Sequence, residues 1–316
     1  YDFKGGLFLK KIISIFLLFV VTFAFCSCGE VERSTGKTSV VTTIFPYYDF
    51  ARSVSKGTCE VDMLLKPGSD VHSFEPTPSD ILKIRNADLF IYNGGESDEW
   101  VDSILESLGD TDKPVVMKMT DYVKPLTEMD ADHHAEDEED EHIWTSLDNA
   151  KTLVSKISDE VSKLDSKNKL IYYRNGLDYI EKISKVQSEI ENTVNSSESK
   201  KIVVGDRFPL LYFATEFSLD WECAFPGCST ETEPSLDRLS KLTDTIEKDK
   251  IKTILKLEMS ENKVADTLAD ETNTKVRTFY SAESVSKEDF ANNITYVDLM
   301  ERNNNALKEA LSNDTN

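Results

Sequence analysis

Compact runs of apolar and β-branched residues alternate along the chain with stretches whose apolar residues recur at helical spacing. The compact runs predict buried strands over residues 39–45, 61–65, 89–92, 115–117, 201–205, 221–225, 253–257 and 275–279. The helical spacing predicts helices that begin at Pro46 and over residues 76–86, 98–108, 149–164, 170–194, 210–217, 233–248, 263–272 and 296–311. Strands that alternate with helices are typical of parallel α/β sheets, so we expect an α/β fold.

The longest helical pattern separates the first four strands from the last four. It covers residues 170–194, about 25 residues, and would be about 37 Å long at a rise of ~1.5 Å per residue. A chain of 316 residues is long enough for about two domains. We therefore predict an α/β lobe over 39–165, a linking helix over 166–198 and a second α/β lobe over 199–316.

The amino terminus has the pattern of a secretion signal. Lys4, Lys10 and Lys11 precede an apolar run over residues 12–25. This run of about 14 residues is shorter than the ~20 that a membrane-spanning helix needs. A positive flank followed by a short apolar stretch predicts a signal peptide over residues 1–27, and hence a location outside the cytoplasm.

The apolar run ends in two closely spaced cysteines, Cys26 and Cys28. A cysteine that follows a small residue at this point resembles the cleavage site of bacterial lipoproteins. Cys28 is then the lipid-carrying first residue of the mature protein, and the polar stretch 28–38 is a tether to the membrane. An uncleaved anchor helix and an ordinary signal peptide with incidental cysteines are the alternatives.

Charge narrows the classes of partner. The chain has 36 Lys and Arg against 58 Asp and Glu, a net charge of −22. Nucleic-acid binding relies on Lys and Arg that neutralise phosphates, so this balance argues against it and favours cations as ligands.

An acidic segment over residues 128–141 interrupts the alternation. It holds nine acids, no Lys or Arg, and the pair His133–His134. It has no apolar period, which predicts a mobile loop. The loop either collects cations weakly, with His133 and His134 as auxiliary ligands, or is a solvated insert without a role.

The cysteines outside the signal give little chemistry. Cys223 and Cys228 flank the turn sequence Phe225-Pro226-Gly227, so a disulfide is possible outside the cytoplasm. A buried free thiol is an equal alternative.

Histidines are scarce, and two of them lie in loops next to predicted structure. His72 follows a predicted strand, and His142 precedes a predicted helix. Loops at the carboxyl ends of parallel strands commonly bind ligands, and zinc or manganese sites without cysteine use histidine and carboxylate. Each histidine alone is more often a surface or capping residue. Together, in a chain rich in acids, they indicate a metal site.

Several motifs in order resemble one protein family. They are residues 42–46, 68–78, 93–96 with Trp100, 142–144, 205–209, 225–229 and Thr295-Tyr296. The chain resembles the ZnuA/TroA-like solute-binding lipoproteins of metal-specific ABC importers over residues 39–311. This resemblance implies two α/β lobes joined by one long rigid helix, with Zn²⁺ or alternatively Mn²⁺ in the cleft between them. It also implies a monomer that delivers the ion to an ABC permease and is not an enzyme.

The resemblance also implies a ligand set. His72 and His142 match the two ligands of the first lobe, and Glu283 is the best candidate near the last strand. The remaining ligand falls in 205–208, which contains no histidine. Asp206 is the chemically possible ligand there, because the guanidinium of Arg207 has no lone pair to offer a metal.

Two functions from other classes are the alternatives. A surface adhesin or structural lipoprotein could keep the same fold without transport. A metal-dependent hydrolase could use a site of two histidines and one carboxylate, but the chain has no HExxH helix and no nucleophile elbow.

Overall fold

Two parallel sheets form the framework of the protein. The computed structural model describes residues 36–109, 113–130, 132–227, 233–260 and 263–312. The first sheet has the order β2-β1-β3-β4 and the second β10-β9-β7-β8, with parallel neighbours throughout. The strands are β1 (Thr38–Thr42), β2 (Cys59–Met63), β3 (Leu89–Tyr92), β4 (Val115–Lys118), β7 (Lys201–Val204), β8 (Asp220–Cys223), β9 (Thr253–Leu257) and β10 (Lys275–Phe279).

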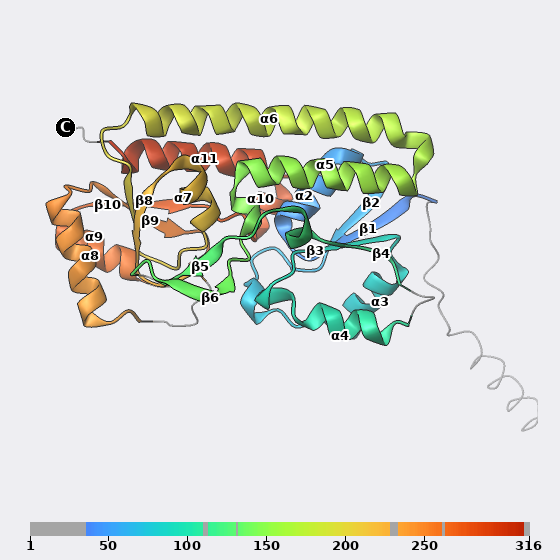
Figure 1. Ribbon diagram of the computed structural model, residues 1–316, viewed down its shortest axis with the longest axis horizontal. Coiled ribbons are helices and arrows are strands. Elements are labelled where there is room, and N and C mark those ends of the chain that lie inside the picture. The colour runs from blue at the N-terminus through green and yellow to red at the C-terminus, as the bar shows by residue number, and fades with distance from the viewer. Residues whose placement is uncertain (1–35, 110–112, 131, 228–232, 261–262, 313–316) are drawn as a thin grey trace, which may run out of the picture. The chain divides into compact units, whose positions relative to one another are not determined.

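Helices cover both faces of each sheet. The longest, α6 (Lys169–Ser196), runs past both sheets, with α5 (Leu147–Leu164) and α11 (Tyr296–Ala310) beside it (Figure 1). The remaining helices are α2 (Phe45–Ser55), α3 (Pro78–Asn86), α4 (Trp100–Ser107), α7 (Leu211–Phe217), α8 (Leu236–Lys248), α9 (Val264–Thr272) and α10 (Lys287–Ala291). The predicted α/β class and the long helix are confirmed, whereas the domain boundaries stay a prediction.

Adjacent residues of a strand feed different cores, because side chains of a strand alternate between its faces. Val40 belongs to a large cluster that reaches along α6 to the second sheet, whereas Val41 packs with α3 and α4 on the opposite face. Val204 and Val203 divide in the same way, Val203 packing with α8 and α9. β1 and β7 are therefore covered on both faces, which explains why each carries adjacent apolar residues.

Local signals in the sequence account for the helix starts. Pro46 occupies the first turn of α2, where a missing N–H costs nothing. Thr77 and Asp80 form a capping box at the start of α3, each side chain accepting the other's backbone N–H. Thr295 and Asp298 do the same for α11.

The acidic segment is a hairpin, so the prediction of a mobile loop was wrong. Strands β5 (Thr127–Met129) and β6 (Ala135–Glu139) pair antiparallel. Asp132 lies 2.9 Å from Lys241 and 3.3 Å from Arg238, both on α8. The backbone ladder and these cations stabilise a segment whose like charges alone would favour disorder.

The remaining predictions concern the cysteines and the membrane. Cys223 is a buried thiol, and burial raises its pKa to about 12. Of the two alternatives for Cys223, the structure therefore has the buried free thiol rather than the disulfide. The signal peptide 1–27, Cys28 and Cys228 lie outside the described residues, so the proposed lipidation stays a prediction. Within the described part of the chain, every helix is too short or too polar to span a membrane.

A buried carboxylate joins three helices that belong to different parts of the chain. Asp49 of α2 is fully buried and accepts hydrogen bonds from Arg52 Nε at 2.8 Å, from the Tyr296 backbone N–H at 2.9 Å, and from the hydroxyl of Tyr179. Asp49 therefore connects α2 to α6 and α11.

Replacing Asp49 should destabilise the whole fold. Asp49→Ala leaves three donors without their acceptor, and we expect a loss of about 3 kcal/mol in the free energy of unfolding, measured by urea denaturation. Asp178→Asn is the control, because the pair of Asp178 with Lys56 is more than half exposed on both sides. Equal stability of the two variants would contradict the role of Asp49.

Candidate metal site

Three of the predicted ligands lie together. His72, His142 and Glu283 each offer one ligand atom, and these atoms all lie within 4.8 Å of one another. We call these three residues the ligand group. His72 is in the 3-10 turn Val71–Ser73 beyond β2, His142 precedes the turn Ile143–Thr145, and Glu283 follows β10. The ends of β2 and β10 thus bring loops of the two sheets to one point.

His142 is held through one nitrogen and leaves the other open. Its imidazole is fully buried, and Nδ1 lies 3.2 Å from Asp140 Oδ1, which also accepts the His142 backbone N–H at 2.8 Å. Nε2 is buried and has no hydrogen-bond partner in the described structure. It lies 4.0 Å from Glu283 Oε1. A buried nitrogen without a partner, facing a carboxylate, is suited to a cation between them.

His72 is positioned by groups from two loops. Its backbone N–H donates to Asp70 Oδ1 at 2.9 Å, and its Nδ1 lies 3.3 Å from Ser97 Oγ. Asp70 Oδ2 in turn lies 3.5 Å from Arg207 Nη2, which follows β7 in the second sheet. The His72 loop is therefore tied both to its own lobe and to the facing one.

Glu283 lies on a turn that a second carboxylate organises. Glu258, just beyond β9, accepts the Ser281 N–H at 2.9 Å, the Ser281 hydroxyl at 2.8 Å and the Ala282 N–H at 3.0 Å. Trp144 Nε1 donates to Ser281 O at 2.8 Å. Ala282 adopts a left-handed backbone conformation with φ of 63°, which these bonds stabilise.

Burial and neighbouring charges shift the pKa values in the site. Burial raises the pKa of Glu283 to about 8, although the facing His142 opposes the shift. Burial disfavours the cation of His142, but Asp140 and Glu283 outweigh it and raise the pKa of His142 to about 9. The pKa of His72 is lowered by removal from water and by the nearby His142. Without a metal, the group therefore retains protons near neutral pH.

Asp206 does not lie in the ligand group found among the described residues. It is buried, and its Oδ1 and Oδ2 accept the backbone N–H of Arg207 at 2.9 Å and of Leu257 at 3.3 Å. The prediction chose Asp206 because of its acidic side chain. The structure uses that side chain to satisfy backbone donors after β7 and β9.

The two hairpin histidines also lie apart from the ligand group. The ring of His133 stacks on Trp221 of β8 with centroids 4.0 Å apart. His134 Nδ1 lies 2.9 Å from Asp130 Oδ2 at the exposed turn of the hairpin. Their role as auxiliary metal ligands stays a prediction.

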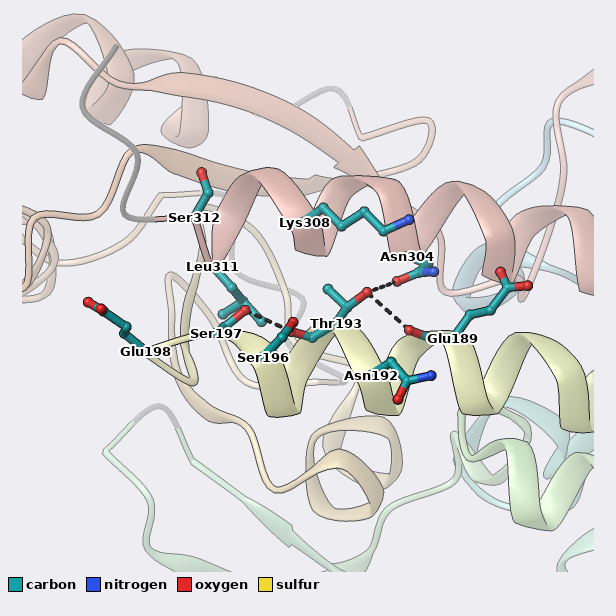
Figure 2. Close-up of a pocket in the computed structure, with 10 residues that line it drawn as sticks. All are labelled: Glu189, Asn192, Thr193, Ser196, Ser197, Glu198, Asn304, Lys308, Leu311 and Ser312. Carbon is teal, nitrogen blue, oxygen red and sulfur yellow. Dashed lines mark hydrogen bonds between the residues drawn. The ribbon is translucent and has the colours of Figure 1, made fainter.

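An open groove lies elsewhere. It has a volume of about 710 Å³ and is formed by the C-terminal parts of α6 and α11 (Figure 2). Thr193 and Asn304 join its two sides by a hydrogen bond of 2.7 Å. None of its lining residues belongs to the ligand group, so this groove is not the metal site.

Comparison with known proteins decides the family. The family model described as "Zinc-uptake complex component A periplasmic", ZnuA, matches residues 40–310. The chain belongs to this family. The high-affinity zinc uptake system protein ZnuA of Bacillus subtilis (strain 168) is 33% identical, with 97% of each chain covered. The predicted family resemblance is thus confirmed.

Two further matches concern a longer protein. The zinc-binding lipoprotein AdcA of Streptococcus pneumoniae (strain ATCC BAA-255 / R6) is 31% identical over 95% of this chain, which spans 61% of AdcA. The crystal structure of the Zn(II)-bound ZnuA-like domain of Streptococcus pneumoniae AdcA has a TM-score of 0.74 and 30% identity, covering 87% of this chain and 99% of that domain. The family and these relatives are named for zinc uptake or zinc binding, so the prediction that the chain is not an enzyme is confirmed.

Sequence reasoning missed the residues that position the ligand group. Asp140 and Glu141 lie inside the run of nine acids, where nothing distinguishes them from solvated neighbours. Ser97 lies in the 3-10 turn Glu96–Asp98 and Glu258 in the turn after β9, and neither belongs to a motif. One signal was available: an Asp two residues before a His can accept its backbone N–H, as Asp140 does.

Removing Glu258 should weaken zinc binding by loosening the turn that carries Glu283. In Glu258→Ala, the Ser281 and Ala282 N–H groups lose their acceptor, and we expect roughly a tenfold loss of zinc affinity and faster amide exchange over residues 280–284. Glu301→Ala, an exposed change on α11, is the control. Unchanged amide exchange and zinc affinity in Glu258→Ala would show that the turn over residues 280–284 is stable without Glu258.

Proposed function

We propose that the protein captures a zinc ion outside the cytoplasm and delivers it to an ABC importer. The observation that carries this proposal is the unpartnered, buried Nε2 of His142 facing Glu283, with His72 completing the ligand group. Membership of the zinc-uptake family supports the same conclusion. His72, His142 and Glu283 are the proposed ligands.

The donor set favours zinc over manganese. Two imidazole nitrogens and one carboxylate, with a fourth position left to water, are a common zinc arrangement, with Zn–N distances of about 2.0–2.1 Å. Manganese prefers sites richer in carboxylate, carbonyl and water oxygens. An ion that must be handed on also benefits from ligands on facing loops, because small movements of the loops release it.

Attachment and partner follow from the same function. The sequence predicts lipidation at Cys28, and AdcA, a relative at 31% identity, is named a lipoprotein. We propose a monomer held at the outer face of the cell membrane, from which it reaches the permease. Adhesion without transport stays an alternative that no further feature of the described residues favours.

Zinc titration of variants tests the ligand group. The parent should bind one equivalent of Zn²⁺, and more tightly than Mn²⁺. His72→Ala, His142→Ala and Glu283→Gln should each lose at least about tenfold in zinc affinity, because each removes one donor atom. Calorimetric competition against a chelator measures this loss.

His134→Ala is the matched control, since it removes an exposed imidazole outside the ligand group and should leave the tight equivalent unchanged. The proposal fails if His72→Ala and His142→Ala bind zinc as tightly as the parent.

Zinc binding should release protons and weaken in acid. The raised pKa values of His142 and Glu283 mean that the metal-free group holds protons at pH 7, which the ion must displace. Between pH 8 and pH 6 we expect affinity to fall by about tenfold per pH unit for each displaced proton. Calorimetry in buffers of different ionisation enthalpy counts these protons, and no proton release at pH 7 would contradict the description of the metal-free site.

A further inference from the structure

Three consecutive residues serve both imidazoles of the ligand group. In Asp140-Glu141-His142, Asp140 bonds to Nδ1 of the adjacent His142. Glu141 contacts Ser97, which lies next to His72. Glu141 Oε1 lies 2.5 Å from Ser97 Oγ, and Glu141 Oε2 accepts the Ser97 backbone N–H at 3.0 Å. Ser97 Oγ then lies 3.3 Å from His72 Nδ1.

The number of available hydrogens fixes which atom donates in each hydrogen bond from Glu141 through Ser97 to His72. Ser97 has one hydroxyl hydrogen, and it donates this hydrogen to Oε1 of the Glu141 carboxylate. A serine oxygen that has donated its hydrogen still has lone pairs, so toward His72 it can only accept. The hydrogen between Ser97 and His72 must therefore come from Nδ1, which leaves the lone pair of a neutral His72 on Nε2.

We propose that Glu141, acting through Ser97, holds His72 in the Nδ1–H form, so that its Nε2 is free to bind the ion. This inference rests on the proposed function and deepens it. Glu141 and Ser97 are positioning residues, since in this account they do not touch the metal. The tripeptide that contains the ligand His142 thus also determines which nitrogen of His72 carries the hydrogen.

The surrounding structure holds Glu141 in place. Glu141 is 4% exposed, and its backbone oxygen accepts Asn93 Nδ2 at 2.9 Å. Gly95 packs against its side chain: a Cβ at Gly95 would lie 2.5 Å from Glu141 Oε2 and 2.7 Å from Glu141 Cβ. With a φ of 113°, Gly95 also has a backbone conformation that favours glycine. A carboxylate confined in this way fixes the acceptor for Ser97.

Replacing Glu141 by glutamine should reverse the direction of the hydrogen bonds between residue 141, Ser97 and His72. The Ser97 backbone N–H can only donate, so the glutamine must turn its oxygen toward that N–H and its NH₂ toward Ser97 Oγ. Ser97 then accepts from the amide and donates its own hydrogen to His72 Nδ1. His72 is forced into the Nε2–H form, and the nitrogen proposed to bind the ion carries a hydrogen.

The deciding measurement is the nitrogen NMR spectrum of the imidazoles in the metal-free protein, with His72 assigned by its loss in His72→Gln. At a pH where His72 is neutral, the parent should show a protonated Nδ1 and an unprotonated Nε2, and Glu141→Gln should show the reverse. The proposal is overturned if the parent shows Nε2–H, or if Glu141→Gln leaves the form unchanged.

Zinc affinity gives an independent readout. Glu141→Gln should lose on the order of 10–100-fold, and Ser97→Ala about tenfold, because alanine releases Nδ1 without forcing the wrong form. Ser97→Thr keeps a hydroxyl and should restore the NMR pattern and most of the affinity. Glu139→Gln, which removes the same charge from an exposed position of the hairpin, should match the parent. Equal affinities of Glu141→Gln and Glu139→Gln would overturn the proposal.

The two readouts separate this inference from the proposed function. If the parent fails to bind zinc, the proposed function fails. The NMR pattern of the metal-free protein still decides whether hydrogen bonds from Glu141 through Ser97 fix the protonated nitrogen of His72. If the parent binds zinc and the NMR form of His72 is insensitive to Glu141→Gln, only the inference fails.

Discussion

The site depends on one constraint of imidazole chemistry: a nitrogen that carries a hydrogen cannot bind a metal. Each histidine of the ligand group has its Nδ1 engaged, His142 by Asp140 and His72 by Ser97. The second nitrogen of His142 is then left buried without a partner, close to Glu283. Burial of so polar a nitrogen is unfavourable in the metal-free protein and is relieved when a cation binds.

The fold supplies the rigidity that this arrangement needs. Parallel strands deliver the loops of His72 and Glu283 at their carboxyl ends, and α6 packs along both sheets. Asp49 bonds to residues of α6 and α11, which ties the first lobe to helices that continue past the second. The acidic hairpin adds a further link, with Asp132 at the cations of α8 and the segment's end at His142. Ligands from different loops are thereby held at separations suited to a single ion.

Much of the fold and part of the site follow from local sequence. The predicted bounds of β9 and β10 match the structure. β9 lies inside its sheet and begins with three consecutive buried residues, as expected for a strand covered on both faces, whereas β10 lies at the edge and buries only Phe279 fully. His72 and His142 stood out because histidine is scarce in this chain and both flank structured elements. The hairpin was missed because β6 (Ala135–Glu139) consists of one alanine and four acids and therefore has no apolar period. Asp206 could not be separated from Glu283 by sequence, since only the fold decides that the Asp206 carboxylate accepts two backbone N–H groups while the Glu283 carboxylate faces His142.

X-ray absorption at the zinc edge of the zinc-loaded protein reports the atoms bound to the ion, and it therefore tests the proposed ligand group itself. We expect two imidazole nitrogens and light oxygen donors at about 2.0–2.1 Å from the zinc ion, with no sulfur among its ligands. The buried thiols of Cys59 and Cys223 lie outside the ligand group. A sulfur ligand, or fewer than two imidazoles bound to the ion, would contradict the proposed ligand group.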